Sequence, residues 1–326
     1  MPFPRLNFIT HDPMESDYRP AVDATGRHVI FERTPRGGGI TTLFITSIDT
    51  SHGPEPFIHD LACTHATTGP SQARPDWCWA TGHVALNVAG SDRSPPHVVI
   101  AEPSGIPLGN VPGSIRWIYP TWSSDGTQLI VINATGVGHP RTLLISPNGT
   151  VAQANLNGND VNGRPMFGGF ASPRPGNPPR WGNPSLIAYA GQPNAPGWNG
   201  ASPAGYNQNR NYVFLNATSA ETFTSAPLEP DASITRFDKS HQGRAPTWSP
   251  DGRYLAFESN RVDERRYAIF LVNVSAASKP VQVTDAAYDA QHAKFFPDGK
   301  SLIVTAFQTP GHGPRGIAQL DISGYL

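Results

Sequence analysis

The stretch APTWSPDGRYLAF, residues 245–257, decides the fold because it joins two short apolar runs through Asp251-Gly252. Asp-Gly between apolar runs is a strong hairpin signal, since glycine supplies the positive φ that the tight turn requires. The pattern recurs as YPTWSSDGTQLIV (119–131), AKFFPDGKSLIV (293–304) and RPAVDATGRHVIF (19–31), and in degraded form as RPDWCWATGHVAL (74–86) and PRWGNPSLIAY (179–189). A recurring unit of this length indicates a repeat architecture.

Six such repeats predict a β-propeller. The turn positions 26, 82, 126, 182, 252 and 299 lie 56, 44, 56, 70 and 47 residues apart. A third apolar strand follows each hairpin, as at 268–272, and a fourth often follows, as at 280–284. We therefore expect an all-β, six-bladed propeller of four-stranded blades, forming a single domain over residues 1–326. Residues 4–10 should supply the outer strand of the last blade and close the ring.

Composition excludes several classes of protein. The 24 Lys and Arg residues nearly balance the 25 Asp and Glu residues, so the positive field of a general nucleic-acid or polybasic membrane binder is absent. The 32 Gly and 34 Pro residues exclude a mainly helical chain. No apolar run reaches the roughly 18 residues of a membrane span, and no secretory signal is visible, which favours a cytoplasmic location.

The Trp-Ser-Pro-Asp-Gly hairpin at 248–252 resembles the TolB-like family of propellers, and the resemblance covers the whole chain as six repeats. It implies the propeller fold. The N-terminal α/β domain of TolB itself has no counterpart here, so a role in the Tol system is not implied. Relatives of this family include oligogalacturonate lyase, whose channel-mouth histidines hold Mn²⁺. By that resemblance His241 and His292 are candidate ligands of a divalent cation, Mn²⁺, Ca²⁺ or Zn²⁺, although the lyase has seven repeats.

The two faces of the predicted ring differ. The face with the first-to-second strand hairpins has mostly minimal turns and is called the turn face below. The other face, called the loop face, has long loops rich in His, Arg, Trp, Asn and Asp. Long loops on a rigid scaffold commonly carry function. We therefore expect the working site on the loop face at the channel mouth, where seven histidines fall: His11, His59, His65, His139, His241, His292 and His312.

These loops supply the candidate site residues. Histidine can transfer protons near neutral pH, and arginine binds carboxylate or phosphate in a bidentate manner. The candidate catalytic residues are His241, His292, His11 and Asp289. The candidate substrate-binding residues are Arg141, Arg315, His139, His312, Trp198 and Tyr206, the two arginines being chosen because few acidic residues lie near them in the sequence. Each histidine could instead cap a strand end. Trp77, Trp122, Trp181 and Trp248 occupy one repeat position, which predicts packing between blades.

The sequence leaves two classes of function open. The first is a site for a small polar or acidic, carbohydrate-like molecule, in its most concrete form a cation-assisted lyase or hydrolase. The second is a non-catalytic scaffold that binds a protein partner, as many propellers do. A lectin with one weak site per blade ranks last, because the loops differ too much between blades. Fold class does not decide among these.

Overall fold

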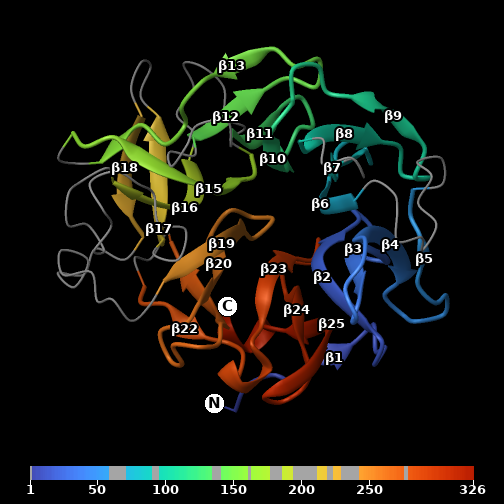
Figure 1. Ribbon diagram of the computed structural model, residues 1–326. Coiled ribbons are helices and arrows are strands. Elements are labelled where there is room, and N and C mark those ends of the chain that lie inside the picture. The colour runs from blue at the N-terminus through green and yellow to red at the C-terminus, as the bar shows by residue number, and fades with distance from the viewer. Residues whose placement is uncertain are drawn as a thin grey trace.

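The protein is a ring of six β-sheets around a central channel (Figure 1). The computed structural model describes residues 2–58, 71–89, 95–133, 141–160, 163–176, 186–193, 211–218, 223–228, 242–274 and 278–326. The prediction of a six-bladed β-propeller is confirmed. No helix in these ranges is long and apolar enough to cross a membrane.

Blades 1 to 3 follow one another along the chain, each running from an inner strand to an outer one. Blade 1 contains β2 (Glu15–Val22), β3 (His28–Pro35), β4 (Thr42–Ser47) and β5 (Glu55–Pro56). Blade 2 contains β6 (Ser71–Trp77), β7 (Val84–Ala89), β8 (His97–Ala101) and β9 (Pro107–Asn110). Blade 3 contains β10 (Trp117–Trp122), β11 (Leu129–Asn133), β12 (Arg141–Ile145) and β13 (Val151–Gln153).

Blades 4 and 5 repeat this order. Blade 4 contains β15 (Met166–Pro173), β16 (Leu186–Pro193), β17 (Tyr212–Thr218) and β18 (Phe223–Pro227). It gains a fifth strand, because β14 (Asn159–Asp160) in the connection from blade 3 pairs in parallel with β18. Blade 5 contains β19 (Gly243–Trp248), β20 (Tyr254–Ser259), β21 (Ala268–Asn273) and β22 (Val281–Gln282).

The ring closes as the sequence predicts. Blade 6 consists of β23 (Gln291–Phe295), β24 (Ser301–Thr309) and β25 (His312–Asp321), with β1 (Asn7–Phe8) as its outer strand. Asn7 pairs with Gln319 and Phe8 with Ala318, so the first segment of the chain completes the last blade. Two short 3₁₀ helices, η3 (Ala286–Tyr288) and η4 (Ser323–Tyr325), flank this blade.

The apolar core lies between the blades. Six clusters of buried side chains occupy the six interfaces, such as the one that joins Ile130 of blade 3 to Tyr189 of blade 4. Trp122 and Trp248 belong to two of these clusters and are only 6% and 4% exposed, which confirms their predicted packing. Because neighbouring sheets are held face to face in this way, the inner strands form a rigid wall around the channel.

Candidate functional site in the central channel

A β-bulge interrupts the inner strand of every blade at the same repeat position. In blade 1, for example, the register between β2 and β3 shifts between Tyr18 and Ala21. The bulge places one non-glycine residue per blade at a φ between 47° and 56°: Arg19, Arg74, Tyr119, Phe170, Ala245 and His292. Bulges re-aim side chains. All six of these residues, called the bulge ring below, line one cavity in the channel.

The preceding blade holds the strained backbone of the bulge ring in place. Left-handed φ values are unfavourable for side-chain-bearing residues, so they persist only where the surroundings fix them. In four of the blades an acceptor on the second strand of the previous blade binds the backbone N–H of the bulge residue. The pairs are Arg74 to Glu32 (2.6 Å), His292 to Glu258 (2.6 Å), Tyr119 to Asn87 (2.9 Å) and Arg19 to Thr305 (3.1 Å).

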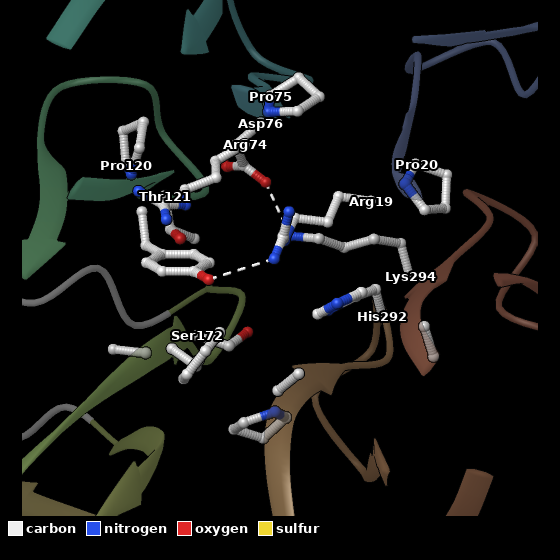
Figure 2. A pocket seen from close by; sticks show the side chains of 16 residues that line it. Arg19, Pro20, Arg74, Pro75, Asp76, Pro120, Thr121, Ser172, His292 and Lys294 are labelled. Carbon is white, nitrogen blue, oxygen red and sulfur yellow. Dashed lines mark hydrogen bonds and ion pairs between the residues drawn. The ribbon is translucent and has the colours of Figure 1, made fainter. Parts of the chain in front are cut away.

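The cavity enclosed by the bulge ring, called the channel cavity below, is small and has both cationic and aromatic side chains in its lining. Its volume of about 80 Å³ admits one compact functional group rather than a long ligand. Figure 2 shows Arg19, Arg74, His292 and Lys294 around it. The rings of Tyr119 and Phe170, with their centroids 4.3 Å apart, also line the cavity. The cavity therefore brings cationic and aromatic side chains together, and Arg19 and Lys294 are paired with Glu32 and Asp76.

Arg74 has an unusual environment among the cations of the cavity. Its guanidinium lies 4.1 Å from the centroid of the Tyr119 ring, and it has no carboxylate partner within the described part of the chain. Arg19, in contrast, pairs with Glu32 at 2.7 Å and donates from Nη2 to the Tyr119 hydroxyl at 3.4 Å. The buried Nε atoms of both arginines lack an acceptor among the described residues. Arg74 therefore has hydrogen-bonding capacity left for a ligand.

His292 is buried against this group of cations. Burial, followed by the charges of Arg19, Arg244, Arg315 and Lys294, lowers the pKa of His292 well below the usual range for histidine. The imidazole is therefore neutral at pH 7. Its Nδ1 lies 3.9 Å from Glu258 Oε2, and its ring lies 6.3 Å from that of Tyr18. The same burial and charges that keep the imidazole neutral also disfavour its protonated form.

A second set of residues follows the bulge ring by two positions in each blade: Ala21, Asp76, Thr121, Ser172, Thr247 and Lys294, called the waist ring below. All six line a second cavity, and Asp76, Thr121, Ser172 and Lys294 line the channel cavity as well. Lys294 Nζ of blade 6 pairs with Asp76 Oδ1 of blade 2 at 2.8 Å, past the intervening blade 1. The second cavity lies toward the turn face, has a volume of about 320 Å³ and is called the turn-face chamber below.

The structure brings some of the predicted site residues together. His292 lines the channel cavity. Arg315 forms a buried ion pair with Asp289, and its guanidinium carbon lies 5.2 Å from the centroid of the Tyr18 ring. Arg315 has few acidic neighbours in the sequence, but Asp289, which is remote in sequence, pairs with it in the folded chain.

The other predicted site residues lie apart or cannot be placed. His11, His312 and Arg141 are exposed, and none of the three lines the channel cavity. His139, His241, Trp198 and Tyr206 lie outside the described residues, as does Trp181. Within the described ranges no three His, Cys, Asp or Glu side chains are grouped so as to hold a metal ion. Because His241 is not among them, the predicted divalent-cation site stays a prediction.

The bulge ring itself escaped sequence analysis, although its signal is present. Four of the six repeats begin with a variable residue followed by proline: Arg19-Pro20, Arg74-Pro75, Tyr119-Pro120 and Ala245-Pro246. Proline has no N–H and fixes φ, so a recurrent proline inside an inner strand indicates a bulge. The residue before it is the bulge residue, which is Arg, Arg, Tyr and Ala in these four repeats.

The fold and the channel define a six-bladed β-propeller with a small polar cavity on its axis. No protein-family model matches the chain, and no curated protein sequence is similar to it. Among solved structures it is similar to TolB from Acinetobacter baumannii, with a TM-score of 0.58 and 12% identity over 90% of this chain and 64% of that one. The chain thus spans slightly less than two thirds of that protein's length.

Two further solved structures extend the comparison. A protein assigned as TolB from Agrobacterium tumefaciens has a TM-score of 0.51 and 15% identity over 86% of this chain and 81% of that chain. Oligogalacturonate lyase in complex with manganese has a TM-score of 0.50 and 12% identity over 98% of this chain and 93% of that chain. At these identities the likeness shows the fold alone. The resemblance to TolB-like propellers is confirmed at that level.

Proposed function

We propose that the protein binds a small organic anion, such as a carboxylate, in the channel cavity. The observation that carries the proposal is the guanidinium of Arg74, which faces the cavity without a carboxylate partner among the described residues. A planar guanidinium binds carboxylate or phosphate through two parallel hydrogen bonds. Arg19 lies 5.7 Å from the centroid of the same Tyr119 ring, but Glu32 offsets its charge at 2.7 Å, so Arg74 supplies the positive charge for the anion.

The size and the walls of the cavity narrow the class of ligand. A volume of about 80 Å³ accommodates the acidic group, while the rest of the ligand must extend along the channel. Tyr119 and Phe170 offer an apolar surface for its carbon skeleton. An acidic sugar or a short-chain organic acid meets both requirements. The divalent cation for which His241 and His292 are candidate ligands stays part of the proposal, as an addition to this anion site.

Proton transfer is a second candidate function, and the neutral imidazole of His292 is the observation that favours it. The lowered pKa of His292 leaves the ring unprotonated at neutral pH, and a bound carboxylate would raise its basicity by offsetting the positive charges that lower this pKa. A proton acceptor beside a bound carboxylate is an arrangement suited to a lyase that removes a proton from the carbon next to the acid. Replacement of His292 by Gln should then abolish turnover of a uronate while anion binding to Arg74 persists.

Isothermal titration with galacturonate, succinate and inorganic phosphate tests the anion site. At least one of the three should bind the unmodified protein, and Arg74→Gln should weaken that binding by about tenfold or more, because hydrogen bonds to charged groups contribute about 1.5–3 kcal/mol. The matched control is Arg253→Gln, since Arg253 is 64% exposed and pairs with Asp251 in a surface turn. Equal affinity of both variants, or no binding of any of the three anions, refutes the proposal.

A further inference from the structure

The turn-face chamber differs in kind from the channel cavity. It has about four times the volume, at 320 Å³ against 80 Å³, and lies at the lower end of the range for small-molecule pockets. Its described lining contains four tryptophans: Trp77, Trp79, Trp122 and Trp248. Among the described residues that line it, the charged ones are Asp76 and Lys294, which pair at 2.8 Å. The described lining therefore has no net charge to attract an ion.

The floor of the chamber is the waist ring, which offers unused hydroxyl groups. Thr121, Ser172 and Thr247 occupy one repeat position in three consecutive blades and all line the chamber. Their side-chain hydroxyls make no hydrogen bond to another residue in the described ranges. Each hydroxyl can donate once and accept twice. The floor thus presents a set of neutral donors and acceptors arranged around the channel axis.

The ion pair completes this floor at a fixed position. Asp76 accepts the backbone N–H of Trp122 at 2.8 Å through Oδ2, while its Oδ1 accepts from Lys294. Both carboxylate oxygens are therefore oriented by the protein before any ligand arrives. A carboxylate and an ammonium side by side offer an acceptor and a donor to two adjacent hydroxyls of a ligand.

The aromatic walls are also held in position. The indole N–H groups of Trp77, Trp79 and Trp248 donate to backbone carbonyls of Gly82 (2.8 Å), Val22 (2.8 Å) and Ser172 (3.2 Å). Trp79 is 37% exposed, so its ring remains accessible at the rim. Because these polar ends are bound by the protein, the rings contribute apolar surface to the chamber. Rigid aromatic surface binds a ligand with little loss of side-chain entropy.

We propose that the turn-face chamber is a second binding site, for the ring of a neutral sugar. The C–H bonds of a pyranose ring would lie against Trp79 and Trp77, and its hydroxyls would hydrogen-bond to the waist ring. A wholly apolar ligand would bury the free hydroxyls of the floor without partners, which is costly. An anion would gain nothing from a neutralised ion pair. A neutral molecule with many hydroxyls satisfies both the walls and the floor.

Tryptophan fluorescence provides the test, since the lining indoles report directly on an occupant. The full-length protein is titrated with the methyl glycosides of glucose, galactose, mannose and N-acetylglucosamine. At least one glycoside should give a saturable change in emission. Thr121→Val should weaken its binding about three- to tenfold, and Trp79→Ala should weaken it further. Thr309→Val is the matched control for the lost hydroxyl, because Thr309 is exposed on β24 away from the channel.

The anion site and the sugar site are separated by a second pair of measurements. Arg74→Gln should leave glycoside binding unchanged, because Arg74 does not line the turn-face chamber. Two results overturn the sugar proposal: no saturable change with any glycoside, or equal affinity of Thr121→Val and Thr309→Val. Circular dichroism of each variant confirms that it is folded.

Discussion

Replacing Glu258 tests how the bulge ring is held together. This carboxylate is fully buried on β20 of blade 5 and connects two elements of the channel. It forms an ion pair with Arg244 of its own blade and accepts the backbone N–H of His292 in blade 6 at 2.6 Å. Glu258→Ala therefore removes one partner of a buried ion pair and the acceptor of a strained backbone N–H in the same step.

The expected magnitude follows from these two contacts. Removing one partner of a buried ion pair costs about 3–5 kcal/mol, and the lower end applies because the Arg244 side chain is 23% exposed. An unsatisfied backbone N–H adds about 1 kcal/mol or more. Glu258→Ala should thus lower the free energy of unfolding by about 4 kcal/mol. Glu258→Gln should cost about 1 kcal/mol less than Glu258→Ala, because the amide oxygen still accepts the N–H, as the amide of Asn87 does for Tyr119.

Urea unfolding followed by far-ultraviolet circular dichroism measures these differences, provided that the m-value is the same for all variants. The matched control is Glu264→Ala, since Glu264 is exposed and its change should stay within about 0.5 kcal/mol of the unmodified protein. A cost for Glu258→Ala as small as that of the control would refute the reasoning. An equal loss in the free energy of unfolding for Glu258→Ala and Glu258→Gln, with His292 in an unchanged position, would also refute it.

Three further predictions concern pH, the turns and ring closure. The pKa of His292 lies below its unfolded value of about 6.5, so just below pH 6.5 the unfolded chain binds a proton that the folded protein does not, and the free energy of unfolding falls by up to about 1.4 kcal/mol per pH unit as the pH decreases. In unfolding measurements, His292→Gln should remove this contribution, whereas His11→Gln should not. Gly126→Ala should lower the melting temperature more than Gly299→Ala. Both residues have a φ near +70°, but a Cβ at Gly126 would lie 2.7 Å from the Thr81 side chain, whereas one at Gly299 would lie 3.6 Å from the nearest atom, in Pro250. Deletion of residues 2–9 should expose the edge of β25 and promote aggregation measurable by light scattering. If the ring closed without β1, the deletion would leave light scattering unchanged.

Local turn chemistry explains why the fold could be predicted from sequence. Gly26, Gly126, Gly252 and Gly299 all have φ values of 67–70°, as Asp-Gly and Thr-Gly hairpins require. Each hairpin is specified by residues adjacent in the chain, and the order of the blades follows from their order in the sequence. The fifth strand of blade 4 was missed because Asn159–Asp160 pairs with a strand more than 60 residues away, without a repeat signal.

The candidate site was harder to predict because it depends on contacts between blades. Arg315 appeared unpaired in sequence, yet the ring closes so that Asp289 lies beside it. Conversely, Arg74 lies in one of the two degraded repeats and has an acidic neighbour in the sequence, Asp76, which suggests an ordinary surface pair. In the structure Asp76 is taken by Lys294 from a different blade, which leaves Arg74 available.

At the repeated bulge, the backbone conformation belongs to the scaffold, whereas the side chains are what a ligand could contact. All six blades have the same strained backbone, so the strain belongs to the architecture and is no evidence of function by itself. The side chains at this position differ between blades, and those of similar chemistry lie in neighbouring blades. His292, Arg19 and Arg74 come from blades 6, 1 and 2, whereas Tyr119 and Phe170 come from blades 3 and 4. An asymmetric ligand with an acidic end and an apolar end therefore has one favourable orientation, with its charge toward blades 1 and 2.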